Sequence, residues 1–359
     1  MHRALALAGL ADGHTSPNPV VGCVVLDAAG QLVGEGFHRR AGDPHAEVMA
    51  LRRAGERARG GSLYVTLEPC CHHGRTPPCS EAVIAAGLKR VVVALPDPDP
   101  RVAGGGIRQL QQAGIEVVSG VCQAEAANQN KAFCHRVRSG QPWGILKWAM
   151  SLDGRTALPN GASQWISGPS ARAWVHRLRA SVDAVIVGGG TVRSDDPLLT
   201  SRGQRQSEPL RVVLSRSLDL PVQAQLWDTT VAPTLVAHGP EAPQAARAQL
   251  DQLGVERLPL DGCEPKALLQ ALAARGCNRV LWECGPELAA AAIAQQGVQE
   301  LAAVIAPTLL GGQAARTPLG NLGFTAMEQV LRLEPGHPLQ LGADWLLQLP
   351  LPPPSPAEA

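Results

Sequence analysis

Three observations predict that the 359-residue chain folds as two α/β domains. Apolar runs rich in β-branched residues alternate with helical patterns, which is typical of α/β layers. The chain is about twice as long as an ordinary domain. All seven tryptophans lie after residue 142, so the composition changes at one point. The turn-rich segment 139–142 stands at that point and predicts a linker near residues 138–143.

The predicted first domain covers residues 1–141 and opens with an amphipathic helix. The apolar run at residues 4–11 is too short for a signal peptide and is followed at once by Asp12. After it we expect, in order, strand 20–26, helix 45–59, strand 62–67, helix 80–87, strand 90–95, helix 104–113 and strand 115–119.

The predicted second domain covers residues 143–350 and shows no sequence repeat of the first. Its expected strands are 144–150, 184–187, 211–214, 234–237, 279–283 and 300–305. Residues 351–359 are rich in Pro, Ser, Ala and Glu, which predicts a disordered tail.

Composition excludes several classes of protein. A hydrophobic content of 45%, a charged content of 18% and a net charge of +1 argue against extended disorder and against a strongly basic nucleic-acid binder. No apolar run approaches the roughly 18 residues of a membrane span. Nine cysteines without an export signal predict reduced thiols in a cytoplasmic protein. Most are expected to be buried core residues: Cys23, Cys122, Cys134, Cys263, Cys277 and Cys284.

The strongest chemical signal is a set of zinc ligands, His45, Cys70 and Cys79. One histidine and two thiolates leave the fourth position of a zinc ion to water, as catalytic zinc sites do. Glu47 lies two residues from a ligand, so it can take a proton from that water and pass it to a ring nitrogen and to departing ammonia. This pattern predicts hydrolytic deamination.

Local sequence places two ligands at helix N-termini. Asp43 and Pro44 are typical of N-cap and N1 positions, which would put His45 in the first turn, and Cys79 opens the next predicted helix. The positive ends of these helices favour the thiolate form of a cysteine.

Four alternatives remain open. The cysteines could fill the core, or belong to a closed structural site with Cys71 or His72 as fourth ligand. The first domain could deaminate nucleic acid, although it has a net charge of +3 and only three aromatic residues, Phe37, Tyr64 and Phe133. It could also be a non-catalytic zinc-stabilised binding module, for which Glu47 would be dispensable.

The second domain carries weaker signals. A glycine turn follows strand 184–187, and another follows strand 279–283 and leads into a helix, a geometry that accepts phosphates. Lys147 and Glu283 lie on apolar strands, where an unpaired charge is costly, so we expect an ion pair between them. Lys147 is a candidate for proton transfer.

The zinc-ligand motifs resemble a known family. Zinc deaminases share H-x-E followed by P-C-x-x-C, and this chain keeps those elements with a wider cysteine spacing. The run Thr66-Leu-Glu-Pro-Cys-Cys-His-His-Gly-Arg-Thr-Pro-Pro-Cys79, with Pro17-Asn18-Pro19 and His45-Ala46-Glu47, resembles the deaminase domain of the bacterial bifunctional riboflavin-biosynthesis deaminase/reductases.

That resemblance implies a cytidine-deaminase-like, three-layer domain with one zinc ion on His45, Cys70 and Cys79, Glu47 as proton shuttle, and Asn18, His38 and Arg75 near the substrate. The chain departs from the family at Cys71, where Ser is usual, and at Asp97-Pro98-Asp99-Pro100, where Asp-Pro-Asn-Pro is usual. It also begins a few residues short of the family's usual start, so we expect native sequence before Met1.

The motifs of the second half resemble the reductase domain of the same family, in the expected order: Lys147-Trp-Ala-Met-Ser-Leu-Asp-Gly-Arg155, Ser163-Gln-Trp-Ile166, Thr191-Val-Arg-Ser-Asp-Asp-Pro-Leu-Leu-Thr200 and Glu283-Cys-Gly-Pro-Glu-Leu288. The resemblance implies a dihydrofolate-reductase-like α/β domain and a homo-oligomer. It implies NADPH at Ala149, Trp165, Thr191, Asp195, Gly285, Pro286, Glu287 and Leu288. Arg216, just past strand 211–214, is then a candidate contact for the phosphate that distinguishes NADPH from NADH. The implied substrate is a phosphoribosyl pyrimidine, bound at Ser163, Arg179, Leu199, Arg202 and Glu283. The resemblance implies no nucleic-acid or membrane partner.

Overall fold

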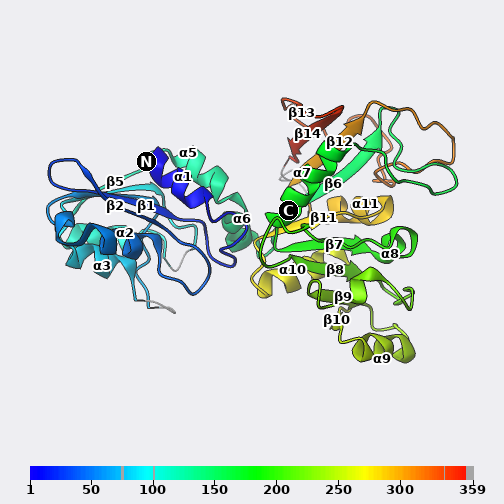
Figure 1. The fold of residues 1–359 in the computed structure, drawn as a ribbon, viewed down its shortest axis with the longest axis horizontal. Helices are drawn as coiled ribbons and strands as arrows, with labels where there is room; N and C mark the ends of the chain where they lie inside the picture. Colours follow the sequence, from blue (N-terminus) through cyan, green and yellow to red (C-terminus); the bar gives the residue numbers. More distant parts are fainter. Residues whose placement is uncertain (74–76, 100–101, 335, 353–359) are drawn as a thin grey trace. The chain divides into compact units, whose positions relative to one another are not determined.

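The computed structural model describes residues 1–73, 77–99, 102–334 and 336–352. The chain divides into two compact units, Met1–Gly140 and Gln141–Ala359 (Figure 1). Most of the predicted tail, 353–359, lies outside the described residues. Both units are α/β, as predicted.

The first unit is built on a five-stranded sheet of order β2-β1-β3-β4-β5. Strand β1 pairs antiparallel with β2 and β3, and β3, β4 and β5 are parallel. The strands are β1 (Gly22–Leu26), β2 (Leu32–Phe37), β3 (Ser62–Leu67), β4 (Arg90–Leu95) and β5 (Glu116–Ser119). The helices are α1 (His2–Gly9), α2 (Ala46–Ala54), α3 (Cys79–Ala85), α4 (Gly105–Gln112), α5 (Gln123–Gln129) and α6 (Lys131–Ser139), with a 3₁₀ turn η1 (Gly55–Ala58) after α2.

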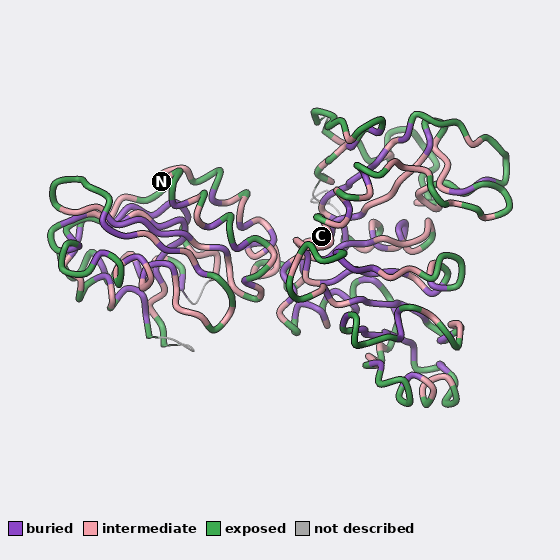
Figure 2. Tube along the Cα trace, viewed as in Figure 1, coloured by how far each residue is buried: buried purple, intermediate pink, exposed green. Residues whose placement is uncertain are grey.

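Helices cover both faces of this sheet, which gives three layers (Figure 1). On one face Ala50 of α2, Val83 of α3 and Leu110 of α4 pack in one buried cluster with the sheet. On the other face Ala126 of α5 and Cys134 of α6 pack against Leu67 and Leu95. Figure 2 shows the sheet as the buried centre of the unit.

Two details of helix α2 differ from the prediction. Asp43 is not the N-cap: the helix begins at Ala46, and His45 is the N-cap residue with an extended backbone. The expected helix 45–59 is also interrupted, because Gly55 adopts φ +56°, a left-handed value that no residue inside an α-helix takes. Its last turn is the separate 3₁₀ segment η1.

The second unit contains a nine-stranded sheet of order β10-β9-β8-β7-β11-β6-β12-β14-β13. All neighbours are parallel except β12–β14 and β13–β14, which are antiparallel. The strands are β6 (Trp143–Ser151), β7 (Ala184–Gly188), β8 (Leu210–Leu214), β9 (Thr234–His238), β10 (Glu256–Pro259), β11 (Arg279–Trp282), β12 (Glu300–Ala306), β13 (Leu339–Leu341) and β14 (Asp344–Pro350).

Helices flank this sheet on both faces as well. Three pack in one buried cluster, through Val175, Val192 and Leu250, and two in another, through Leu269 and Ala289. They are α7 (Pro169–Ala180), α8 (Gly189–Asp195) and α9 (Gln244–Gln252) on one face and α10 (Pro265–Ala274) and α11 (Pro286–Ala294) on the other; a 3₁₀ turn η2 (Gln225–Trp227) precedes β9. None of the described helices is both long and apolar enough to cross a membrane.

Candidate functional site

The predicted zinc ligands come together in the first unit. His45 caps α2, Cys79 is the first residue of α3 and Cys70 lies in the loop after β3. His45 Nδ1 lies 3.2 Å from Cys79 Sγ and 3.6 Å from Cys70 Sγ. The Cys79 backbone N–H donates to Cys70 Sγ at 3.3 Å. Two helix N-termini therefore meet at one point beside the end of a strand.

This donor set fits zinc. Zn–N and Zn–S bonds of about 2.1 and 2.3 Å in a tetrahedron separate the ligand atoms by roughly 3.5–3.8 Å, and these three atoms lie within 4.8 Å of one another. The hydrogen bond between the two thiols lowers the pKa of Cys70 and raises that of Cys79, so Cys70 is the first of the pair to offer a thiolate to a metal.

A closed structural zinc site finds no support in the described residues. The group of converging donors comprises His45, Cys70 and Cys79 alone, and neither Cys71 nor His72 joins it. The Cys71 thiol lies instead against Gly105 at the start of α4, because a Cβ built on that glycine would meet Cys71 Sγ at 2.6 Å. A three-residue set that leaves one metal position open is the catalytic type.

Glu47 lies in the first turn of α2 with only 3% of its surface exposed. Burial, opposed by the nearby His45, raises the pKa of its carboxyl to about 7. The carboxyl also hydrogen-bonds to Cys79. A buried carboxyl beside the ligands, with a pKa near neutrality, can both accept and return a proton.

Asn18 and His38, both predicted to lie near the substrate, meet beside the ligands. Asn18 Nδ2 lies 2.9 Å from His38 Nε2, and His38 Nδ1 donates to the Pro44 carbonyl at 3.3 Å. The His38 and His45 rings stand edge to face with centroids 5.3 Å apart. Burial lowers the pKa of His38, which keeps the ring neutral. Arg75, the third predicted contact, lies outside the described residues.

Two buried polar residues that hold this site together were not predicted. The Glu68 carboxylate accepts backbone N–H groups of Asp97, Gly104 and Ile107 at 3.0–3.1 Å, and so fixes the loop before α4 next to Cys70. Asn130 donates to the Val20 carbonyl and accepts from its N–H, both at 2.9 Å. Glu68 follows a buried strand directly, a signal that could have identified it.

In the second unit, three charged side chains form one buried group. Glu283 follows β11, Lys147 lies on β6 and Arg179 lies near the end of α7. Arg179 Nε donates to Glu283 Oε1 at 2.6 Å, and Lys147 Nζ lies 3.5 Å from Glu283 Oε2. Burial acts to raise the pKa of Glu283, but the two cations outweigh it and lower the pKa to about 2. The expected Lys147–Glu283 pair is confirmed, with Arg179 as a third member.

Further basic side chains lie near this group. Arg172, His176 and Arg179 are spaced by four and three residues on α7, so they share one face of the helix. Burial, followed by the charges of Arg179 and Arg202, lowers the pKa of His176, which places Arg202 near the same face. The Arg172 guanidinium lies 4.7 Å from the centre of the Trp165 ring, which is 70% exposed. His176 was missed, although its spacing from the two arginines could have indicated it.

The two predicted glycine turns lie side by side. Strands β7 and β11 are neighbours in the sheet, and a Cβ added to Gly188 would lie 3.3 Å from Leu288 of α11. Gly285 is the N-cap of α11, which begins with Pro286 and Glu287. Thr191 and Asp195 lie on α8, which starts at the other turn, and Ala149 lies on β6. The predicted cofactor residues are therefore grouped around adjacent strand ends, with Trp165 in the loop before α7.

The remaining predicted contacts differ in exposure. Ser163 is half-buried in the loop before α7, and Arg202 is exposed. Leu199 packs in the core of the unit with 2% of its surface exposed. Its side chain therefore faces the core.

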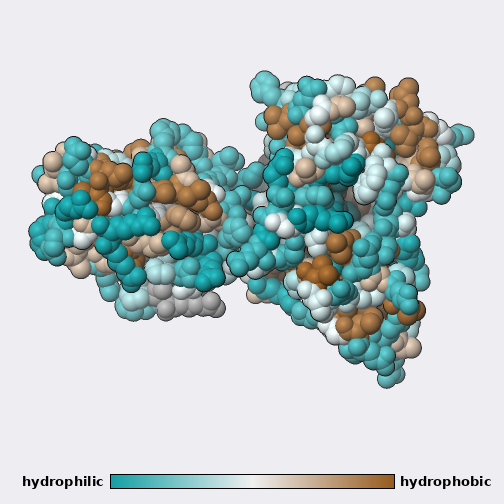
Figure 3. Space-filling model, in the orientation of Figure 1, coloured by the Kyte–Doolittle hydropathy of each residue, from teal (hydrophilic) through white to brown (hydrophobic). Residues whose placement is uncertain are grey.

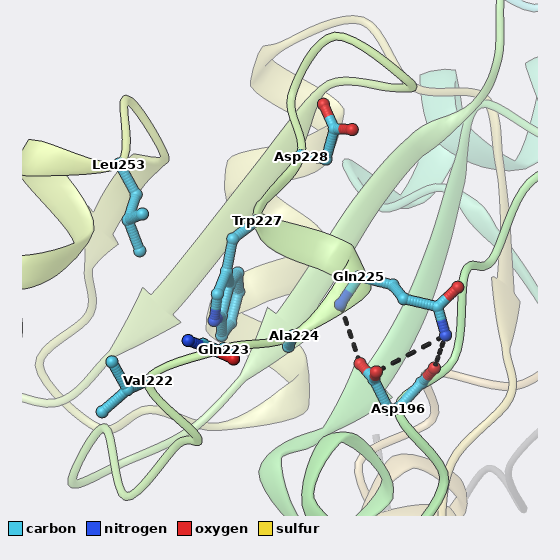
Figure 4. A pocket seen from close by; sticks show the side chains of 8 residues that line it. All are labelled: Asp196, Val222, Gln223, Ala224, Gln225, Trp227, Asp228 and Leu253. Carbon is cyan, nitrogen blue, oxygen red and sulfur yellow. Dashed lines mark hydrogen bonds between the residues drawn. The ribbon is translucent and has the colours of Figure 1, made fainter.

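A separate concavity of about 580 Å³ lies beside η2 (Figure 4). Val222, Trp227 and Leu253 line it, and Asp196 accepts the Gln225 backbone N–H at 2.8 Å on one side. No predicted site residue lines it. Asp196 is the neighbour of Asp195, so the concavity adjoins the end of α8.

Comparisons with known proteins agree with this division. The model of the cytidine and deoxycytidylate deaminase zinc-binding region matches residues 1–95, and the model of the RibD C-terminal domain matches residues 142–347. The chain is 52% identical to the riboflavin biosynthesis protein RibD of Synechocystis over 96% of this chain and 94% of that protein. It is 45% identical to RibD of Escherichia coli over 88% of both.

Solved structures are similar over nearly the whole chain. RibD of Acinetobacter baumannii gives a TM-score of 0.89 at 43% identity, with 98% of both chains covered. A diaminohydroxyphosphoribosylaminopyrimidine deaminase/5-amino-6-(5-phosphoribosylamino)uracil reductase from Thermotoga maritima gives 0.86 at 32% identity, covering 98% of this chain and 97% of that one. The chain therefore belongs to the RibD family of riboflavin-biosynthesis enzymes, which join a zinc-binding deaminase domain to a reductase domain.

Proposed function

We propose that residues 1–141 deaminate 2,5-diamino-6-ribosylamino-4(3H)-pyrimidinone 5′-phosphate. Residues 143–350 then use NADPH to reduce the ribosyl chain of the product to ribityl. The observation that carries the proposal is the convergence of His45, Cys70 and Cys79 beside the buried carboxyl of Glu47.

In the first step, zinc held by the three ligands would supply Lewis acidity that activates a water molecule. Glu47 takes a proton from the water as its oxygen adds to the carbon that bears the amino group. Glu47 passes this proton to the ring nitrogen. It then moves the second proton, from the added hydroxyl, to the amino group, which leaves as ammonia while the carbonyl forms. Asn18 and His38, joined at 2.9 Å, are placed to orient the pyrimidine.

In the second step, NADPH would supply hydride to C1 of the ribose. The bond from C1 to the ring oxygen breaks, and that oxygen needs a proton. In the triad of Lys147, Arg179 and Glu283, the proton donor is Lys147, whose Nζ lies 3.5 Å from Glu283 Oε2. Arg179 and Arg202 provide cations for the 5-phosphate of the sugar, while the glycine turns after β7 and β11 receive the nucleotide.

A two-activity assay tests the proposal. Glu47→Ala should retain zinc and lose deamination by about 10²–10⁴-fold, because only the proton shuttle is removed. Cys79→Ser should lose zinc and deamination together. Ammonia release from the pyrimidine, zinc content, and NADPH oxidation with the deaminated product are measured on the same preparations.

The reductase activity of each variant is the internal control, since both substitutions lie in the first unit. Normal deamination by Glu47→Ala would refute the mechanism. Activity of the wild type on an RNA stem-loop but not on the pyrimidine would favour nucleic-acid deamination instead.

We further propose that the enzyme acts in the cytoplasm on small molecules, without nucleic acid or membrane partners, as a homo-oligomer. The described cysteines are all free thiols, which supports a reducing compartment. Exposed apolar side chains after β12, among them Leu309 and Met327, support self-association. Separate hydrophobic patches also appear on the surface in Figure 3. Sedimentation velocity at several concentrations measures the oligomeric state.

A further inference from the structure

One other group of metal-binding side chains converges in the part of the chain that the structure describes. The ligand atoms of His2, Cys122 and Glu125 all lie within 4.8 Å of one another, and His2 Nε2 lies 4.0 Å from Cys122 Sγ. Cys122 was predicted to be a buried core residue, but it is only half-buried. The group belongs to neither of the sites described above.

Local structure explains why the three side chains meet. Cys122 is the N-cap of α5 and Glu125 is its third residue, two positions whose side chains face each other at a helix start. His2 is the first residue of α1. Both helices lie on the face of the sheet opposite α2 and α3, which carry the catalytic ligands (Figure 1).

The pairing of α1 with α5 does not depend on these three residues. Gln129 Nε2 of α5 donates to the Leu5 carbonyl of α1 at 3.0 Å. Met1 and Leu5 pack against the same buried cluster as Ala126 and Ala127. The donors are therefore presented by a scaffold that is already held in place, which lowers the entropic cost of binding an ion.

The donor set has the chemistry of a zinc-class site. Zinc binds histidine, cysteine and carboxylate side chains in proteins, and His2, Cys122 and Glu125 are one of each. Glu125 makes no ion pair among the described residues, and it is exposed, as is His2. Their rotamers are thus free to close the present separations to the roughly 3.4–3.8 Å of a coordinated set.

We propose that His2, Cys122 and Glu125 bind a second divalent transition-metal ion of the zinc class, with water completing its coordination. The ion joins α1 to α5 and links positions 120 residues apart in the chain. It ties down the N-terminal helix and takes no part in deamination.

Zinc titration of the full chain, purified without a histidine tag, tests this site. With the catalytic site filled first, the wild type should bind about one further zinc ion per chain. His2→Ala, Cys122→Ser and Glu125→Gln should each weaken that second event by tenfold or more and leave deamination unchanged. His14→Ala, which removes another exposed histidine of the same unit, should bind as the wild type does.

Cobalt gives a second readout of the same site. Co²⁺ added to chains whose catalytic site holds zinc should produce a thiolate-to-metal charge-transfer band, which Cys122→Ser removes. The Glu47→Ala variant, whose catalytic site still holds zinc, should keep this band, because its second site is intact. The proposal is overturned if the wild type binds a single zinc ion, or if all three variants still bind the second zinc ion as the wild type does.

Discussion

Opposing effects set the pKa of the buried Glu283 carboxyl. Burial favours its neutral form, yet Arg179 and Lys147 keep it charged, with a pKa of about 2. A carboxyl whose pKa is lowered in the folded state adds stability that is fully present above its unfolded pKa, near 4.3, and is lost as the pH falls toward 2. The second unit should therefore lose roughly 3 kcal/mol of stability from this group in that range.

Glu283→Gln tests this expectation. The variant should be less stable near pH 6, because Arg179 loses its buried partner, and its stability should fall less steeply between pH 4.5 and 3 than that of the wild type. All seven tryptophans lie in the second unit, so urea unfolding followed by tryptophan fluorescence reports that unit alone. If the stability of the two proteins fell in parallel with pH, Glu283 would not be the group responsible.

Arg216 gives a test of cofactor choice. It is exposed just after β8, next to the glycine turn that follows β7. A guanidinium in this position can pair with the extra phosphate of NADPH, and a charge-assisted pair is worth about 1.5–3 kcal/mol. Arg216→Ala should thus reduce the preference for NADPH over NADH by about 10–100-fold, measured as the ratio of kcat/KM values. An unchanged ratio would place the phosphate elsewhere.

At the same scale, the sequence identified residues whose type and spacing carry chemistry. Zinc coordination and proton transfer explain the types and spacing of His45, Glu47, Cys70 and Cys79. Lys147 and Glu283 were paired because both stand on apolar strands, whereas Arg179 was given no partner because it lies on a helix without such a signal. Asn130 was missed because its partner, the backbone of Val20, leaves no mark in the side-chain pattern.

At the scale of elements, close packing between α4 and the loop after β3 supports the zinc site. A Cβ on Gly106 would lie 1.9 Å from the Pro69 carbonyl oxygen, one residue before the ligand Cys70. Only glycine allows this approach. The helix therefore fixes the backbone from which a ligand projects.

Gly106→Ala should push α4 away from that loop. We expect a loss of stability of about 1–3 kcal/mol in the first unit, as for other overpacked positions, and faster loss of zinc to a chelator. Gly105→Ala is the matched control, because its Cβ meets only the Cys71 thiol, a side chain that can rotate. Equal zinc retention in both variants would show that this contact is unimportant.

Elements with strong apolar patterns were predicted well, and the others were not. The expected strands 184–187, 211–214 and 300–305 correspond to β7, β8 and β12. Strands β2, β10, β13 and β14 were missed. Strand β2 contains two glycines, and β10 and β13 are short and exposed, so none shows the apolar run of a buried strand.

At the scale of the whole molecule, each buried cluster of the described residues belongs to one unit only. Each unit thus has its own hydrophobic core, the property that allows a domain to fold alone. The division between Gly140 and Gln141 falls within the turn-rich segment that the sequence indicated.

Separate expression of residues 1–140 and 141–359 tests this independence. Each fragment should be soluble and unfold cooperatively. The first should release ammonia from the pyrimidine, and the second should oxidise NADPH with the deaminated product. The intact chain is the reference for both rates. A fragment that folds only when its counterpart is present would show that the units depend on each other.

The buried triad also bears on how the enzyme responds to ionic strength. Lys147, Arg179 and Glu283 together carry one excess positive charge, and their side chains are only 16%, 14% and 10% exposed. Dissolved ions screen buried charges much less than exposed ones. Attraction of an anionic sugar by the triad should therefore persist in concentrated salt, whereas the exposed Arg202 contributes mainly in dilute buffer.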